Sequence, residues 1–292
     1  NDKNKSSEGD YSLGKSLVAD NSGNWPEDIN KNMTNLKDGD IIIHIQSRKY
    51  VSGVSVVKKK PIIIFYSTGN EISEKTNIPD WKVRNSNSHY IKSLSRNLFF
   101  KFIDGGILRD KDDKLFKKLI NKNLNSKYDI IITNGAVSAG KFDFVPRVIK
   151  KFKLSKYFKG VAIRPGKPIM FAKFKNNNKS FFGLPGNPIS SAACFKFFVY
   201  PYMRSILNMK KEKPFKAKLI NGYTKKKKFT RFLKSKVLIN KKGYLEVKVL
   251  KGQESFRIKS FTAANTWSLF KSGKSTFKKG ELIECFNPLG GK

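Results

Sequence analysis

The sequence has little of the chemistry from which disulfide frameworks and metal centres are built. Its 292 residues include two cysteines, Cys194 and Cys285, and two histidines, His44 and His89. Two cysteines are too few for a disulfide framework or a cysteine metal site. Histidines so far apart in the chain do not predict a histidine metal centre or a Ser-His-Asp arrangement. This cysteine usage favours a reducing, cytoplasmic setting.

Long apolar runs are also lacking. No stretch approaches the roughly 18 apolar residues of a membrane span, and the richest segment, 192–203, contains Lys196 and Pro201. We see no signal peptide and expect no membrane partner. The chain starts at Asn1 rather than at Met, and we therefore expect a fragment of a longer protein or a processed product.

Acidic residues are scarce beside basic ones. There are 22 Asp and Glu residues against 60 Lys and Arg residues, which gives a formal net charge of +38. Such a charge attracts polyanions in general. The lysines are dispersed along the whole chain, however, and many asparagines accompany them. An AT-rich genome produces such a surface, and we favour that explanation over a specific nucleic-acid partner.

Composition and residue patterns divide the sequence into three parts, which we predict to be whole or partial domains. Residues 1–57 are polar and partly irregular, with short strands expected at 41–43 and 51–57, and look too small for a full domain. Residues 58–212 alternate between buried strands and amphipathic helices. Residues 213–292 contain short alternating segments separated by turns, which is typical of a small all-β barrel or sandwich.

The central part reads as an α/β domain. We expect strands at 61–66, 101–108, 128–133, 159–163, 169–174 and 180–183, and helices at 88–100, from 112, at 144–152 and at 189–203. This alternation predicts a mostly parallel sheet with helices on both faces. Ligands of such folds bind at the carboxyl ends of the strands.

Three acidic residues follow strands of this predicted sheet: Glu71, Asp110 and Asp143. They should therefore lie on one edge of the sheet. A loop with Gly135 and Gly140 connects the strand at 128–133 to Asp143, and its backbone could bind phosphate. A carboxylate beside such a phosphate site is suited to bind Mg²⁺. A tight turn with a capping Asp would give the same pattern.

Two proline-glycine turns complete the predicted site. Residues 164–168 read RPGKP and present Arg164 and Lys167, while residues 184–188 read LPGNP and open a helix that carries Ser190. Proline restricts how these turns can move. Plain connectors would fit the pattern, but two rigid turns near an acidic edge favour an anion site.

Four motifs in this order resemble the molybdopterin molybdotransferase family, which includes MoeA and the E domain of gephyrin. They are STGNEI at 67–72, NGAVSAGKFDF at 134–144, RPGKP at 164–168 and GLPGNPISS at 183–191. The likeness extends from 58 to the C-terminus through GQES at 252–255. It implies a MogA-like α/β domain followed by a small β-barrel. It also implies a role in molybdenum cofactor biosynthesis, namely the Mg²⁺-dependent insertion of molybdate into adenylylated molybdopterin with release of AMP.

The resemblance also implies site residues. Catalytic and metal-ligating roles fall on Glu71, Asp110 and Asp143. Substrate-binding roles fall on Thr68, Gly69, Asn87, Gly135, Ser138, Gly140, Arg164, Lys167, Pro168, Pro185, Gly186, Asn187, Ser190 and Ser255. The family's basic residue in the β domain has no clear counterpart among residues 228–234.

The chain departs from the family at its N-terminus, because the family's N-terminal domains are nearly absent and residues 1–57 look like a remnant of them. Those domains carry further acids and much of the dimer interface, so we expect a homodimer for the full-length form and weaker turnover than binding for this chain. Two other functions stay open. One is molybdopterin adenylyltransferase activity, although adenylyltransferases resemble the central domain alone. The other is non-catalytic binding of pterin or nucleic acid on the same fold.

Overall fold

The computed structural model describes residues 10–12, 16–17, 41–46, 50–56, 60–96, 98–137 and 143–288. The chain forms two compact units, residues 1–60 and residues 61–292. The first unit contains an antiparallel sheet in the order β2-β1-β3-β4. Its strands are β1 (Asp10–Ser12), β2 (Ser16–Leu17), β3 (Ile41–Gln46) and β4 (Tyr50–Val56). The two strands expected here are thus present, and two short ones precede them.

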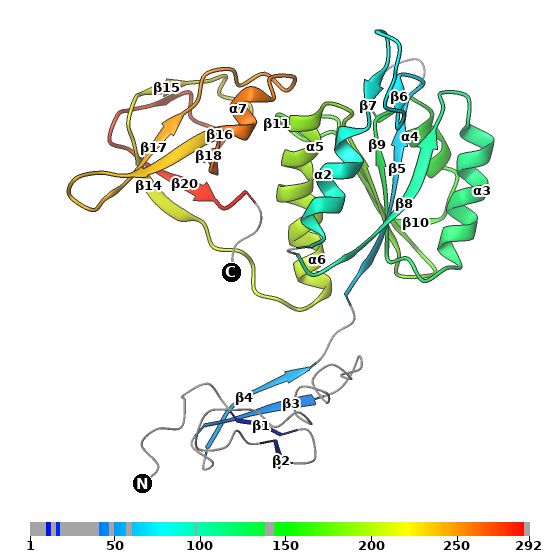
Figure 1. Ribbon diagram of the computed structural model, residues 1–292, viewed down its shortest axis with the longest axis horizontal. Coiled ribbons are helices and arrows are strands. Elements are labelled where there is room, and N and C mark those ends of the chain that lie inside the picture. Colours follow the sequence, from blue (N-terminus) through cyan, green and yellow to red (C-terminus); the bar gives the residue numbers. More distant parts are fainter. Residues whose placement is uncertain are drawn as a thin grey trace. The chain divides into compact units, whose positions relative to one another are not determined.

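A six-stranded sheet with the order β10-β12-β13-β9-β5-β8 forms the centre of the second unit (Figure 1). Its parallel strands are β5 (Ile62–Thr68), β8 (Lys101–Leu108), β9 (Ile130–Asn134) and β13 (Ser180–Leu184). The strands β12 (Met170–Phe174) and β10 (Leu154–Lys159) extend the sheet in antiparallel pairs. The mostly parallel sheet is as expected.

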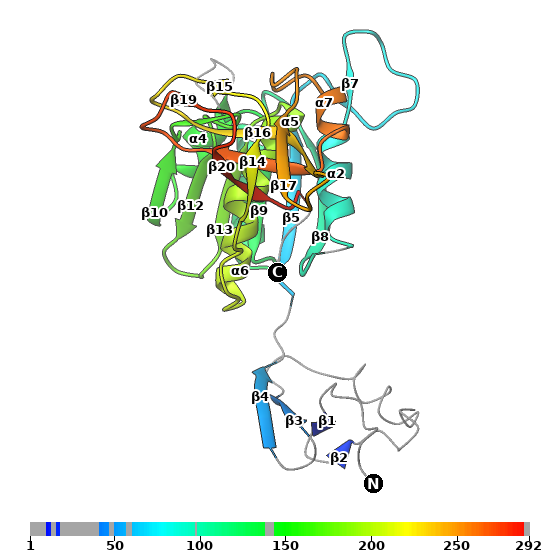
Figure 2. The same ribbon diagram turned by 90° about the vertical axis from the view of Figure 1, so that its left-hand side faces the viewer.

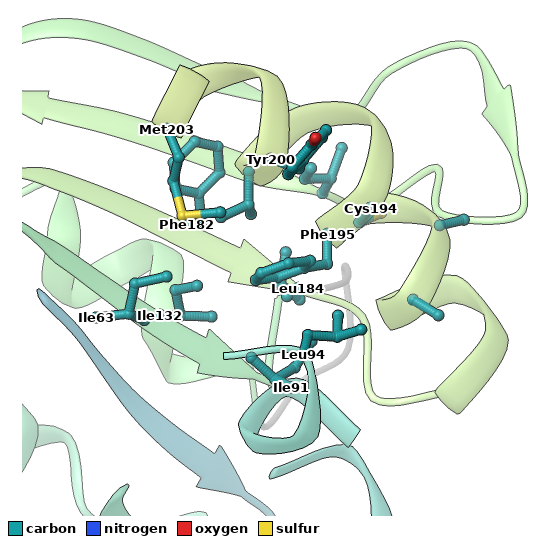
Figure 3. Packing of buried hydrophobic residues seen from close by; sticks show 14 of the residues in the cluster. Ile63, Ile91, Leu94, Ile132, Phe182, Leu184, Cys194, Phe195, Tyr200 and Met203 are labelled. Carbon is teal, nitrogen blue, oxygen red and sulfur yellow. The ribbon is translucent and has the colours of Figure 1, made fainter. Parts of the chain in front are cut away.

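Two hydrophobic cores lie on opposite faces of this sheet because successive strand residues point in opposite directions. On β5, Ile63 and Phe65 belong to one core, and Ile64 and Tyr66 belong to the other. The first core is covered by α2 (Ser86–Leu94), α5 (Pro188–Cys194), the π turn η1 (Phe195–Val199) and α6 (Tyr200–Ile206). Figure 3 shows it from close by. The second core is covered by α3 (Asp113–Leu124) and α4 (Phe144–Ile149).

A closed barrel follows, in which strands pair in the cycle β16-β17-β14-β20-β18-β16 (Figure 2). The strands are β14 (Phe215–Leu219), β16 (Thr230–Ile239), β17 (Leu245–Val249), β18 (Thr266–Phe270) and β20 (Leu282–Phe286). The short strand β11 (Ile163–Arg164) pairs with β16. Closure leaves no free edge among these five strands, which protects them from pairing with other chains.

The barrel packs against the α/β layer through aromatic rings. Phe197 stacks on Phe232 with ring centroids 3.8 Å apart, and it meets Trp267 edge to face at 6.2 Å. Phe232 and Trp267 belong to the core that α5 and α6 cover. The contact fixes the barrel against the helical layer that covers this core. The helix α7 (Lys259–Thr262) and the pairs β6 (Ile72–Ser73) with β7 (Val83–Arg84) and β15 (Tyr223–Thr224) with β19 (Thr276–Phe277) complete the unit.

Some expected element boundaries were wrong. The predicted strand 159–163 is split, because β10 ends at Lys159 and β11 begins at Ile163 with Gly160 at φ +80° between them. The helix expected at 88–100 ends at Leu94, and the helix expected at 144–152 ends at Ile149. Leu98 lies outside the helix but still packs on the core, so its helical spacing reflects burial rather than helix. In the part of the chain that is described, no helix is long and apolar enough to span a membrane.

Candidate functional site

A cavity of about 690 Å³ opens at the carboxyl end of the sheet, a volume typical of small-molecule sites. It gathers most of the residues predicted from the sequence. Those that line it are Thr68, Gly69, Glu71, Asn87, Asp110, Gly135, Asp143, Pro168, Pro185, Gly186 and Asn187. Loops after β5, β8, β9 and β13 and the turn before β12 supply them, so distant motifs of the sequence meet at one place.

The three predicted acids line this cavity, but they do not form a ready-made metal cluster. Among the described residues, no three His, Cys, Asp or Glu side chains stand close enough together to hold a metal ion. The Glu71 carboxyl folds back over Gly69, where a Cβ would fall 2.6 Å from the carboxyl carbon. Gly69 also has φ +133°. The positive φ favours glycine at this position, whereas the exposed Glu71 carboxyl group can move aside for a larger residue.

Two glycines, Gly135 and Gly186, present backbone without side chains to the cavity. Gly135 has φ +101°, and a Cβ there would lie 2.9 Å from the Thr68 carbonyl oxygen. The Gly135 amide donates to the Leu184 carbonyl at 2.8 Å, which joins the β9 loop to the β13 loop. A Cβ on Gly186 would lie 3.7 Å from the Gly135 Cα. The two glycines are thus neighbours, and a ligand can approach the chain closely between them.

A buried amide network holds the three loops around these glycines. The Asn134 side chain, 4% exposed, donates to the Pro185 carbonyl at 2.6 Å and to the Ser191 hydroxyl at 3.0 Å. It accepts from Asn87 at 2.6 Å, and Asn87 also donates to the Gly186 carbonyl at 2.7 Å. Sequence reasoning missed Asn134 as a site residue. Its position directly after a buried strand and before Gly135 was the available signal.

Arg109 holds the loop that carries Glu71. Its Nη1 donates to the carbonyls of Gly69 at 3.0 Å, Asn70 at 3.3 Å and Ile72 at 3.0 Å. The next residue, Asp110, uses its amide to contact the Asn70 side chain at 3.3 Å. No residue pattern indicates this contact, because every residue has a backbone carbonyl group. Arg109 therefore joins the Glu71 loop to the Asp110 loop.

Three helices begin at the cavity, with Ser86 and Asn87 on α2, Asp143 before α4, and Asn187 and Pro188 at the start of α5. The first turn of a helix has unpaired backbone amides and the positive end of the helix dipole. In α2, the Asn85 side chain accepts from the Ser88 amide at 3.4 Å and from the Ser67 hydroxyl at 2.8 Å. In α5, proline occupies the first helical position, which suits it. The arrangement favours an anionic ligand.

Some predicted residues lie elsewhere. Of those described, Arg164, Lys167, Ser190 and Ser255 do not line this cavity. The Arg164 guanidinium lies over the Phe229 ring at 4.7 Å, and Lys167 is exposed. Ser190 is buried in the first turn of α5, and Ser255 is half-buried in a barrel loop. Ser138 and Gly140 fall outside the described residues.

The RPGKP turn nevertheless packs on the helix that the second turn opens. Gly166 has φ +103°, and a Cβ there would approach the Ile163 Cδ1 at 3.3 Å and the Ser190 carbonyl at 3.7 Å. The Cys194 thiol donates to the Gly166 carbonyl at 3.5 Å. Burial raises the pKa of this thiol, which therefore acts as a packing group rather than a nucleophile. The two proline-glycine turns are joined through α5.

Comparison with known proteins identifies relatives of this arrangement. Residues 64–205 match the model of a family described as a probable molybdopterin binding domain. The chain is 30% identical over 275 residues to the molybdopterin molybdenumtransferase of Staphylococcus epidermidis, covering 88% of this chain and 64% of that protein. It is 32% identical over 235 residues to the protein of the same name from Staphylococcus aureus, covering 78% and 54% respectively.

Solved structures share the fold. A molybdopterin biosynthesis moeA protein from Pyrococcus horikoshii OT3 superposes with a TM-score of 0.62 at 22% identity, covering 80% of this chain and 54% of that one. A second structure of the moeA protein from this source gives 0.62 at 24% identity, with coverage of 85% and 68%. The likeness confirms the expected α/β domain followed by a β-barrel. The chain spans 54% to 64% of the length of the curated relatives named above.

Proposed function

We propose that the chain belongs to the molybdopterin molybdenumtransferase family, and that its cavity binds adenylylated molybdopterin and exchanges AMP for molybdate. The observation that carries the proposal is the cavity of about 690 Å³ at the carboxyl end of the sheet. It combines three carboxylates, bare glycine backbone and the starts of three helices. The proposal includes a homodimer for the full-length form.

Mg²⁺ fits the donor set of this cavity. This ion is commonly held by one or two carboxylates together with substrate phosphate oxygens and water. Glu71, Asp110 and Asp143 each line the cavity without forming a cluster of three, which agrees with a site that the substrate's phosphates help to complete. When bound there, Mg²⁺ would supply charge neutralisation on the pyrophosphate.

The chain's own groups would hold the remainder of the substrate. The unpaired amides at the starts of α2 and α5 are suited to the pyrophosphate. Gly135 and Gly186 leave room for close approach to the backbone. Pro168 and Pro185 line the cavity as rigid walls, and rigid walls lower the entropy lost on binding. The thiolates that receive molybdenum would belong to the pterin, since both cysteines of the chain are buried.

Molybdate is a tetrahedral dianion, and we propose that Lys167 and Ser190 bind it beside the cavity. Their turns are joined through the contact of Gly166 with α5. Lys167 is exposed and its side chain does not line the cavity in this structure. The long, exposed side chain of Lys167 can reorient to contact a dianion. The buried side chain of Ser190 stays in place.

The test is a direct product assay on the chain. We expect release of AMP from adenylylated molybdopterin that depends on added molybdate, and no formation of adenylylated molybdopterin from ATP. Formation from ATP would indicate an adenylyltransferase instead. Binding of bulk RNA should be weak and unselective, with dissociation constants of about 10⁻⁴–10⁻⁶ M at physiological salt. Nanomolar, sequence-selective RNA binding without pterin binding would replace the proposal with a nucleic-acid function.

A further inference from the structure

A lysine on a barrel strand is buried, and its ammonium group is fully hydrogen-bonded. Lys234 lies on β16 and is 1% exposed. Its Nζ donates to the carbonyls of Gly252 at 2.7 Å, Glu254 at 3.1 Å and Arg257 at 3.1 Å. A lysine ammonium has three donors and no acceptor. All three donors are thus used by one loop, residues 252–257.

The same loop is tied to β16 by a glutamine. The Lys234 amide donates to Gln253 Oε1 at 3.0 Å, and Gln253 Nε2 donates to the Lys234 carbonyl at 2.8 Å. Gln253 Nε2 also donates to the Leu250 carbonyl at 2.8 Å. The Lys234 carbonyl also accepts from the Leu250 amide at 3.1 Å. The conformation of the loop therefore depends on side chains of Lys234 and Gln253.

This loop leads directly into the wall of the cavity. Ile258, the residue after it, lines the cavity and directly precedes the helix α7. On α7, Phe261 packs edge to face on Tyr90 of α2 with ring centroids 5.8 Å apart. Asn87 of the same helix α2 also lines the cavity. The loop thus sets the position of a barrel segment against the α/β part of the site.

Lys234 itself is not placed to bind the substrate. It does not line the cavity, which is formed on the barrel side by Ile258. Burial lowers the pKa of its amine, and Glu254 nearby raises it. Moving the ammonium to a ligand would take a charged donor away from three carbonyls of this loop at once, those of Gly252, Glu254 and Arg257.

We propose that Lys234 is a positioning residue, whose buried ammonium fixes loop 252–257 and thereby places Ile258 beside the substrate. The inference rests on the proposed function only for what occupies the cavity. It assigns to this lysine a role through the protein backbone rather than through contact with an anion. The alternative, that Lys234 binds the dianion directly, predicts a different set of results.

The decisive comparison is between Lys234→Met and Lys225→Met in the whole chain. Lys225 is also buried, at 6% exposure, and its Nζ donates to the carbonyls of Phe229 at 2.8 Å and Lys274 at 2.7 Å. It does not line the cavity. It therefore controls for the general cost of removing a buried ammonium from the barrel.

Hydrogen exchange reports on the loop without any ligand. The amides of Arg257, Phe261 and Thr262 are hydrogen-bonded to carbonyls within 254–258. We expect them to exchange at least tenfold faster in Lys234→Met and at the wild-type rate in Lys225→Met. We expect Lys234→Arg to restore most of the protection, because the guanidinium keeps several donors. Unchanged protection in a folded Lys234→Met protein would overturn the proposal.

Calorimetric titration with adenylylated molybdopterin links the loop to the site. We expect affinity to fall at least tenfold in Lys234→Met, to recover in Lys234→Arg and to stay within twofold in Lys225→Met. Equal losses in both Met variants, or a loosened loop with unchanged affinity, would contradict a positioning role. If Lys234→Met does not fold, Gln253→Leu removes the amide contacts alone and should give the same pattern with smaller changes. If the wild type binds no adenylylated molybdopterin, the proposed function fails, while the exchange rates still decide whether Lys234 holds the loop.

Discussion

Arg109 donates from Nη1 to the carbonyl of Gly69 at 3.0 Å, so the residue after β8 holds the turn after β5. The contact joins two parallel strand ends, and the same Nη1 reaches Asn70 and Ile72. Glu71 lies between these carbonyls. The orientation of the Glu71 carboxylate, a proposed metal ligand, therefore depends on Arg109 through the backbone of the loop.

Replacing Arg109 with leucine should lower both stability and turnover. Hydrogen bonds to a charged donor contribute about 1.5–3 kcal/mol, and partial exposure reduces this, so we expect a loss of about 1–3 kcal/mol. Arg109→Lys should recover only part, because an ammonium cannot match the planar fork. Arg147→Leu is the control, since its ion pair with Asp113 is exposed, at 3.6 Å, and such pairs contribute about 0–1 kcal/mol. Equal losses in urea unfolding for the two leucine variants would contradict the clamp.

Replacing Asn134 with leucine should disconnect the loops around the glycines. The change leaves the buried Pro185 carbonyl and Ser191 hydroxyl without this donor and removes an acceptor from Asn87. An unpaired buried polar group costs about 1–3 kcal/mol, so we expect a loss of at least that size and weaker ligand binding. Asn125→Leu removes an exposed amide contact at 3.3 Å and should change the free energy of unfolding little. A neutral Asn134→Leu variant would show that the network is dispensable.

Lys167→Ala should raise the molybdate concentration needed for turnover while largely preserving affinity for adenylylated molybdopterin. The reason is that an ammonium interacts more strongly with a dianion than with the pterin. Lys175→Ala is the control, because Lys175 is also an exposed lysine but follows the far end of β12. Lys167 precedes β12, next to Pro168, which lines the cavity. Tungstate should compete with molybdate. If the Lys167→Ala protein loses the pterin but binds molybdate normally in calorimetry, the turn belongs to the pterin phosphate site.

Tyr90 should make stability fall at alkaline pH. Burial raises its pKa from 10.0 to about 12, so its neutral form stabilises the folded chain fully below pH 10, and this contribution is lost as pH rises through about 12. Each pKa unit corresponds to about 1.4 kcal/mol, which gives up to about 3 kcal/mol. Tyr90→Phe should flatten the fall in unfolding free energy between pH 9 and 12. Tyr244→Phe, at an exposed ring, is the control, and identical profiles for the two variants would refute the assignment.

Much of the fold followed from residue patterns. Runs such as Ile130 to Ile132 predict a strand buried on both faces, and the structure confirms this, with alternate residues in separate cores. The barrel strands were predictable because each alternates between an inner and an outer face. The end of α2 at Leu94 was not, since Leu98 keeps helical spacing while it packs from a turn.

The site was only partly predictable. Chain order places Glu71, Asp110 and Asp143 after parallel strands, and all three line one cavity. Spacing carries no information on side-chain direction, so the lack of a three-acid cluster among described residues could not be foreseen. The clamps of Arg109 and Lys234 were missed because their partners are backbone carbonyls, which no residue type reveals.

The most direct test of the central claim is the release of AMP from adenylylated molybdopterin by wild-type chain and by Asp143→Asn, with and without molybdate and at increasing Mg²⁺. Asp113→Asn is the control, because that acid lies on α3 in a surface ion pair. The account predicts molybdate-dependent release by the wild type and by Asp113→Asn, and at least a hundredfold loss in a folded Asp143→Asn protein. Unchanged release by Asp143→Asn at saturating Mg²⁺ would contradict the role of this carboxylate, and no molybdate-dependent release by the wild type would contradict the proposed function.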